Sequence, residues 1–411
     1  MKPFKKLREK YPKFIYEGYC YKVVRNNLKV FFDFRVEPDL RFKPVLIVKN
    51  INRSRIKKIK KEVLDNLVFH LGLIEIPSYW KATCSPEIAI ESGFLNKEQL
   101  RWWKDLIIKG MGQFFYENKI DWRLPNFLKI KTIKTKSNQS RKSAIAEFYD
   151  WYLVPVGGGK DSVVTLEKLK KTGKKINAFT VNPGKAVKDV LRTAGIKNPI
   201  VVERKIDPAL LKLNKRGYLN GHTPFTAVLS FLSVFCAVLF SYKNIAFSNE
   251  KSADEGNVRY LGKMINHQYS KSSDFEKKFQ KYCKKYLVKN IRYFSFLRKY
   301  TELEIAEMFS NYPKYFPVFS SCNKVAAKKL KKRWCGKCPK CLFIYLTLCP
   351  YLKKKQLLKI FGEDLLRKKE LRPILKSLIG QGRVKPFECV GTYAEAKKAL
   401  KLCLKNSKIK K

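Results

Sequence analysis

The first part of the chain alternates apolar and polar residues with a period of two. The alternation runs through Tyr19 to Val24, Leu28 to Phe34 and Val45 to Val48, with turn signals at Arg25-Asn26-Asn27 and Glu37-Pro38-Asp39. Such alternation places one set of side chains on each face of a strand. We therefore predict a small antiparallel sheet between residues 13 and 49.

The next two segments, Arg55 to Leu71 and Lys97 to Glu117, have apolar residues at the spacing of a helix. The polar and basic stretch from Thr132 to Ser143 has no periodicity and is typical of a linker. Residues 1–145 are accordingly predicted to form an N-terminal α+β domain.

After Phe148 the pattern changes to short apolar runs that alternate with amphipathic segments. Strands are predicted at 152–156, 176–181, 200–202 and 244–248, and helices at 161–171, 185–194, 224–242 and 272–286. This alternation indicates an α/β fold whose parallel sheet is connected by crossover helices. We assign residues 146–350 to that domain and 351–411 to a helical C-terminal extension with segments at 357–361, 364–378 and 393–404.

The charge of the chain is strongly positive: 88 Lys and Arg against 34 Asp and Glu give a net charge of +54. A charge of this size attracts nucleic acid and other polyanions, although solvated lysine-rich helix faces explain it equally well. No apolar run follows the basic start, and the apolar run from Ala227 to Phe240 is shorter than the ~20 residues of a membrane span. We expect a cytoplasmic protein without a membrane segment, whose eleven cysteines are mostly thiols or metal ligands.

A glycine-rich loop connects the first strand of the α/β region to its first helix, with the sequence Gly157-Gly158-Gly159-Lys160-Asp161-Ser162. Glycines let backbone N–H groups face an anion, and a helix N-terminus adds unpaired donors and the positive end of its dipole. The alternative is a plain glycine turn with Asp161 as helix cap. The order strand, loop, helix favours a phosphate site, with Lys160 and Ser162 as additional ligands. The Walker A spacing is absent.

Four cysteines follow the spacing of a metal site: Cys322, Cys335, Cys338 and Cys341. Two C-x2-C turns that share Cys338 suit a tetrahedral ion, and zinc is the simplest choice. An iron–sulfur cluster and a set of unligated thiols are the alternatives.

The glycine loop resembles the S-G-G-x-D-S motif of the PP-loop ATP pyrophosphatases, which adenylate a substrate and release pyrophosphate. The chain matches at Gly158, Gly159, Asp161 and Ser162, and has Gly157 where the family has Ser. The resemblance implies ATP and Mg2+ as cofactors. It also places Thr223, within 221–225, and Glu250, within 248–250, in the nucleotide site, with Asp161, Glu250 and Asp254 on the magnesium side.

Three stretches together resemble the UDP-N-acetylmuramoyl-L-alanyl-L-glutamate epimerases of the MurL type: 154–162, 248–257 with 266–271, and 334–341. The resemblance implies an isomerase that makes the D-glutamate of peptidoglycan precursors through carboxylate adenylation. Its substrate would be the UDP-muramyl-dipeptide, which the N-terminal domain would help to recognise. The aromatic residues Tyr79, Trp80, Trp102 and Trp103 either contribute to that recognition or belong to the core.

Two proton carriers on opposite faces of the substrate are required by such a reaction. The candidates from the matching stretches are His222, Glu250, Asp254, Glu255 and His267. The nearby Lys251, Lys263 and Lys271 would hold the UDP diphosphate or are ordinary solvated charges.

The basic charge and the cysteine cluster also fit a second function. The cysteine spacing is similar to that of the PP-loop synthases of deazaguanine (queuosine) biosynthesis, so an enzyme of tRNA or deazaguanine modification is the alternative. A nucleic-acid-binding protein with a degenerate nucleotide loop is a third interpretation, although no RNA-binding module is visible in the sequence.

Overall fold

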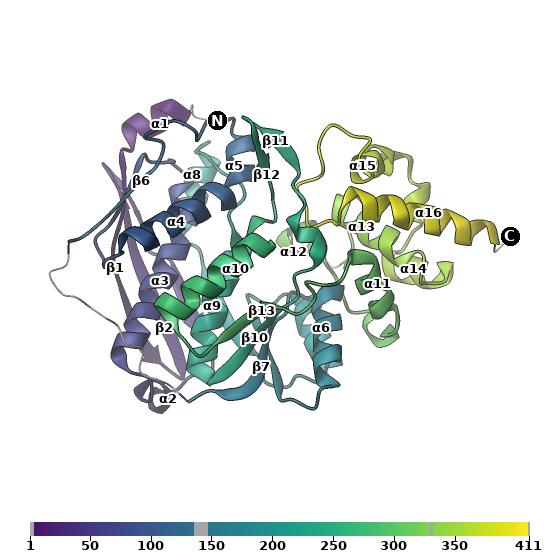
Figure 1. Ribbon diagram of the computed structural model, residues 1–411, viewed down its shortest axis with the longest axis horizontal. Coiled ribbons are helices and arrows are strands. Elements are labelled where there is room, and N and C mark those ends of the chain that lie inside the picture. Colours follow the sequence, from purple (N-terminus) through teal and green to yellow (C-terminus); the bar gives the residue numbers. More distant parts are fainter. Residues whose placement is uncertain (1–3, 135–146, 329–331, 410–411) are drawn as a thin grey trace.

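The computed structural model describes residues 4–134, 147–328 and 332–409 and is organised around an eleven-stranded sheet (Figure 1). In spatial order the strands are β13 (Arg292–Ser295), β10 (Tyr242–Phe247), β7 (Tyr149–Pro155), β8 (Ile176–Val181), β9 (Ile200–Lys205), β4 (Val45–Val48), β2 (Asn27–Val36), β1 (Lys13–Val24), β5 (Glu87–Ile90) and β6 (Lys129–Thr132), with β3 (Leu40–Phe42) paired to β2. Most of the predicted linker lies outside the described residues.

The strands from β13 to β9 are all parallel, which confirms the α/β prediction for this region. The chain passes from β7 to β8 and β9 on one side, and then returns to form β10 and β13 on the other side of β7. The strand order therefore reverses between β7 and β10. In open α/β sheets, ligands bind outside the carboxyl ends of the strands at such a switch point. The glycine loop follows β7, so it lies at this point.

The predicted N-terminal sheet exists, but it is not separate from the parallel one. Strand β4 pairs antiparallel with β9, so that Val48 lies opposite Val202 and Val45 lies opposite Lys205. Strands β5 and β6, which the sequence pattern did not reveal, extend the sheet beyond β1 with parallel pairing. One sheet thus spans both regions. The domain boundaries near 145 and 350 remain predictions.

A buried ion pair also ties the N-terminal region to the parallel strands. Arg204 on β9 donates two hydrogen bonds of 2.6 Å to the carboxylate of Glu75 and one of 2.8 Å to Ser78 Oγ. Glu75 lies on α3 (Lys61–Trp80), and its side chain is 1% exposed. Removing either partner would leave the other charge buried and unpaired.

Hydrophobic cores cover both faces of the sheet. On β7, Leu153 belongs to one core and Val154 to the other. Helices α3 and α9 (Phe225–Phe240) contact each other in the first core, whereas α6 (Lys160–Lys170) and α7 (Lys185–Thr193) contribute to the second. Tyr79 and Trp80 are fully buried in the first core, which favours the structural interpretation of these aromatic residues.

The remaining helices and a short hairpin surround the sheet and its two cores. Five contribute to the N-terminal and central regions: α1 (Phe4–Lys10), α2 (Arg53–Lys57), α4 (Lys97–Gly110), α5 (Gly112–Glu117) and α8 (Pro208–Lys215). A short hairpin of β11 (Val258–Tyr260) and β12 (Lys263–Ile265) precedes α10 (Ser273–Tyr282) and α11 (Glu302–Ser310).

Helices α13 (Pro339–Leu348), α14 (Lys354–Phe361), α15 (Arg372–Leu378) and α16 (Tyr393–Ile409) gather on one side of the molecule, at the right of Figure 1. The short helix α12 (Asn323–Lys328) lies nearer the middle of the view. The predicted helix at 364–378 is broken into two short 3-10 turns and α15, since Pro373 cannot donate a helical hydrogen bond and favours a helix start. Within the described ranges, no helix is both long and apolar enough to cross a membrane.

Candidate active site

The glycine loop presents the start of α6 at the switch point of the sheet. Gly159 is the N-cap of this helix, and no side chain caps it. The first-turn N–H groups of α6 are therefore available to an anion. Gly158 has a φ of +85°, and a Cβ atom there would lie 3.2 Å from the backbone nitrogen of Val187. Only glycine fits this position without strain. Ser162 lies in the first turn, where its Oγ donates to the Gly159 carbonyl at 2.9 Å.

The ammonium group of Lys160 lies inside the protein between two carboxylates. It donates to Asp161 Oδ1 at 2.5 Å and to Glu302 Oε2, and both Lys160 and Glu302 are at most 1% exposed. Burial disfavours the charge of Lys160, but Asp161 and Glu302 outweigh it and raise the pKa of the lysine. Burial, together with the charges of Asp161 and Glu250, raises the pKa of Glu302 to about 7 in spite of Lys160. Glu302 begins α11, far from the loop in sequence, and sequence reasoning missed it.

Two further lysines complete a charged cluster, which we define as Lys160, Asp161, Glu250, Lys271, Glu302 and Lys340. Burial raises the pKa of Asp161, but the charges of Lys160, Lys340 and Lys271 lower it overall. Burial lowers the pKa of Lys271, while Cys389, Glu250 and Asp161 raise it, and the net shift is upward. The cluster therefore holds buried charges of both signs at the carboxyl ends of β7 and β10.

Several polar groups around this cluster lack partners among the described residues. Glu250 follows β10 and is 3% exposed. Ser248 Oγ and Gln268 Oε1 are buried without a hydrogen-bond partner among the described residues. Unsatisfied buried polar groups are rare in folded proteins because each costs about 1–3 kcal/mol. Ser248 directly follows β10 at the switch point, so we take this region as the candidate ligand site.

His222 and His267 form a pair at the edge of the cluster. Their ring centroids lie 4.5 Å apart. Burial, followed by the charges of His267 and Lys81, lowers the pKa of His222 to about 3. Burial and Lys271 lower the pKa of His267 to about 4. Both imidazoles are therefore neutral near pH 7.

The tautomer of His267 follows from its neighbours. Gln113 Nε2 donates to Glu117 Oε1 at 2.7 Å, which directs the amide oxygen of Gln113 toward His267 Nδ1 at 2.5 Å. An amide oxygen can only accept, so Nδ1 carries the proton and Nε2 is left as an acceptor. The ring is thus oriented by α5, and its Nε2 is in the form that a general base requires.

The structure places the other predicted residues as follows. Asp254 is exposed and accepts a hydrogen bond of 2.7 Å from Ser273 N at the start of α10. Glu255 accepts from the buried Lys385 at 2.8 Å. Thr223 is half-buried beside His222 in sequence, just before α9. Of the three lysines considered for the diphosphate, Lys251 and Lys263 are exposed, whereas Lys271 belongs to the charged cluster.

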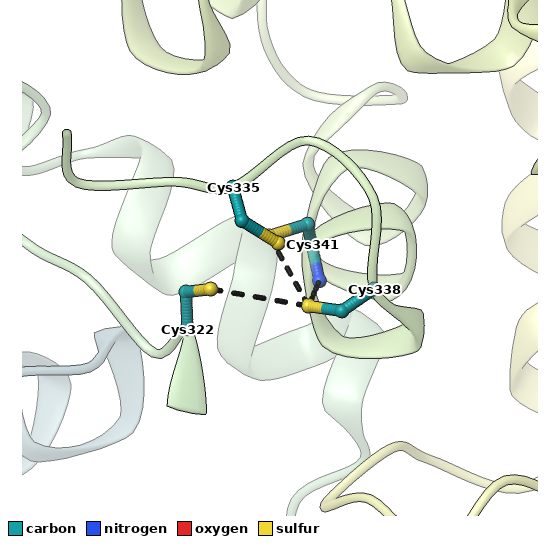
Figure 2. Close-up of side chains that lie close together, drawn as sticks. All are labelled: Cys322, Cys335, Cys338 and Cys341. Carbon is teal, nitrogen blue, oxygen red and sulfur yellow. Dashed lines mark hydrogen bonds between the residues drawn. The ribbon is translucent and has the colours of Figure 1, made fainter. Parts of the chain in front are cut away.

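The four predicted cysteines converge, as Figure 2 shows. Their sulfur atoms lie within 4.8 Å of one another, with separations of 3.9 Å for Cys322–Cys338, 3.6 Å for Cys335–Cys341 and 3.4 Å for Cys338–Cys341. Tetrahedral zinc with Zn–S bonds of ~2.3 Å requires sulfur separations of roughly 3.8 Å. The N–H groups of Lys337 and Cys341 also donate to Cys335 and Cys338. Within the described residues, this is the one group of three or more His, Cys, Asp or Glu side chains that converges in this way. The assignment of Asp161, Glu250 and Asp254 to a magnesium ion remains a prediction.

Comparison with known families identifies the chain. Residues 5–296, more than half of the protein, match the family model described as the MurL N-terminal domain. The chain belongs to the MurL family. A second model, the MurL C-terminal domain, matches residues 318–411. The two matches include the glycine loop, the histidine pair and the cysteines of this MurL-family chain. They confirm the family resemblance, while the relation to the PP-loop enzymes remains a prediction.

Three similar proteins carry the name UDP-N-acetyl-alpha-D-muramoyl-L-alanyl-L-glutamate epimerase. The protein from Micromonospora sp. is 38% identical over 72% of this chain and 65% of its own length. The protein from Xanthomonas oryzae pv. oryzae is 34% identical over 80% of this chain and 72% of its own. The protein from Salinispora tropica is 35% identical over 81% and 72%, respectively. The MurL-family chain thus spans about two thirds of the length of the Micromonospora relative.

Proposed function

We propose that this protein inverts the terminal glutamate of UDP-N-acetylmuramoyl-L-alanyl-L-glutamate, with ATP as second substrate and AMP and pyrophosphate as products. The observation that carries the proposal is the likeness to three epimerases along 72% to 81% of the chain. The charged cluster and the histidine pair support it, because inversion at a carbon next to a carboxylate needs both charge compensation and acid–base groups. These comparisons favour the epimerase over the tRNA-modification alternative.

ATP would solve a specific chemical difficulty. Removing an α-proton beside a free carboxylate builds a second negative charge on the same carbon framework. A mixed anhydride with AMP has a neutral carbonyl instead, into which the electron pair of the broken C–H bond can delocalise. Adenylation of the carboxylate would thereby make the α-proton acidic enough for ordinary side chains to remove it.

The residues of this chain fit a nucleotide at the switch point. The uncapped start of α6 and the loop from Gly157 to Gly159 would hold phosphate oxygens. The unpartnered Ser248 Oγ at the end of β10 would supply a further hydrogen bond. Asp161 and Glu250 carry the carboxylates that would contact Mg2+, the usual companion of a nucleotide phosphate. Lys271 and Lys340 would balance the negative charge that accumulates during transfer.

Proton transfer requires a group that is neutral and accepting at physiological pH. His267 meets this requirement, since its pKa is lowered to about 4 and Gln113 fixes the proton on Nδ1. His222 lies against the same ring and would orient it or exchange protons with it. We therefore assign one of the two acid–base roles to His267.

The cysteine cluster would hold a structural zinc ion. All four positions of a tetrahedral ion are taken by thiolates, so no position remains for a substrate. Lys340 lies between Cys338 and Cys341 at the start of α13, and its ammonium group donates to the Cys389 carbonyl. An ion bound here would fix the place of Lys340 in the charged cluster.

A deuterium experiment tests the proposed reaction. The protein is incubated with the L-glutamate substrate, ATP and Mg2+ in deuterated water, and AMP, pyrophosphate and α-deuterium are followed. We expect AMP that depends on the substrate, together with α-deuterium and D-glutamate after acid hydrolysis. A reaction without ATP is the control. AMP without deuterium incorporation would refute epimerisation, and no AMP at all would refute the adenylation.

A further inference from the structure

A second acid–base group is needed, and a thiol in contact with the charged cluster is a candidate that the sequence did not single out. The thiol of Cys389 lies 3.2 Å from the ammonium group of Lys271. Cys389 is half-buried, in contrast to the fully buried Cys84, Cys236 and Cys283. A thiol is a proton donor and its conjugate thiolate a proton acceptor, and this thiol lies within hydrogen-bond distance of a cation.

The segment around Cys389 runs beside the segment of His267. Asn257 joins the two: its Oδ1 accepts from His267 N at 2.8 Å and its Nδ2 donates to the Pro386 carbonyl at 2.9 Å. The Phe387 ring lies 6.4 Å from the ring of His267. Lys271 contacts the Cys389 thiol, Lys340 donates to the Cys389 carbonyl, and both lysines lower the pKa of His267. Cys389 and the imidazole therefore share two cationic neighbours.

Two buried polar side chains lie near these segments. Gln268 is 5% exposed; its Nε2 lies 3.4 Å from the Val390 carbonyl, and its Oε1 has no partner. Glu250 is 3% exposed, and its charge raises the pKa of Lys271. A buried amide oxygen without a partner, together with the ammonium groups of Lys271 and Lys340, suits a polar, anionic substrate such as a glutamyl group.

We propose that Cys389 is the second proton carrier of the epimerisation and acts opposite His267. This inference rests on the proposed function. One carrier takes the α-proton of the activated glutamyl group, and the electron pair of the C–H bond enters the adjacent carbonyl. The other carrier then donates its proton to the opposite face as that electron pair forms the new C–H bond. When His267 is the base, it ends as imidazolium and Cys389 ends as a thiolate beside Lys271; solvent restores both.

Single-carrier variants test this pairing. Cys389→Ala and His267→Asn are each given the L-glutamate and the D-glutamate substrate with ATP in deuterated water. Each variant should keep substrate-dependent AMP release within about threefold of wild type and lose epimerisation at least 100-fold. Each should also exchange the α-hydrogen of only one epimer, without inversion, and the two variants should exchange opposite epimers. A purely structural role would not produce this complementary pattern.

Cys20→Ala is the matched control, since Cys20 is an exposed thiol on β1. It should retain wild-type activity. Epimerisation by Cys389→Ala within threefold of wild type would overturn the proposal, as would loss of exchange from both epimers while AMP release persists. Failure of the proposed function is distinguishable, because the wild-type protein itself would then release no AMP, or incorporate no α-deuterium, with this substrate.

Discussion

Mild acid should destabilise this protein through His222 and His267. Burial holds both imidazoles neutral, with pKa values lowered to about 3 and about 4 from an ordinary value of 6.5. The unfolded chain therefore binds more protons than the folded one at pH values between these limits. Stability then falls as the pH decreases below 6.5 and continues to fall until the folded-state pKa values are reached.

The size of the effect can be calculated at pH 5.5, one unit below the ordinary pKa of histidine. At pH 5.5 each histidine of the unfolded chain is about nine-tenths protonated, whereas the folded-state imidazoles are still neutral. Each site then costs about 1.35 kcal/mol relative to pH 7.5, or about 2.7 kcal/mol for the pair. The double variant His222→Asn/His267→Asn cannot take up these protons.

Urea denaturation at pH 7.5 and pH 5.5 measures the difference. Other groups also titrate in this range, so the quantity of interest is the loss of unfolding free energy in wild type minus the loss in the double variant. We expect about 2.7 kcal/mol, with each single variant showing about half. Equal losses within about 0.5 kcal/mol would refute the burial of neutral imidazoles.

Three further predictions concern the loop, the ion pair and the metal site. Gly158→Ala should cost about 1–2 kcal/mol of stability, because its φ is +85°, and should also weaken ATP binding measured by calorimetry. Gly195→Ala, with a φ of +70° but open space around its Cβ, should lose stability alone. Arg204→Ala should lower the free energy of unfolding by about 3–5 kcal/mol, since it leaves Glu75 buried and unpaired; replacing both partners by Leu should restore most of this loss. Purified protein should contain one zinc ion by mass spectrometry, and Cys338→Ser should lose both the ion and thermal stability, whereas Cys20→Ser should change neither.

The sequence predicted the strand–loop–helix order of the parallel region because each element there has its own local pattern. The glycine loop, α6 (Lys160–Lys170), β8 (Ile176–Val181) and α9 (Phe225–Phe240) appear within one or two residues of their predicted bounds. The convergence of the four cysteines was also predictable, since three of them lie within seven residues of each other.

Long-range pairing left no such signal. Nothing in the short apolar strand Val45–Val48 indicates that its partner is β9 rather than another strand of the N-terminal sheet. The same reason explains why Glu302, Lys340 and Cys389 were not recognised as neighbours of the glycine loop or of Lys271. Each is an ordinary residue in its local context and acquires its environment only through tertiary packing.

The pairing of β4 with β9 also has consequences for the synthesis of the chain and for its expression as fragments. During synthesis β4 emerges long before β9 exists, and until then its outer edge offers unpaired N–H and C=O groups. A nascent or truncated chain that ends before β9 would carry an open, apolar strand edge, which is a template for association with other chains. Recombinant fragments cut near residue 145 should therefore precipitate, and co-expressed halves should recover solubility by completing the sheet in trans.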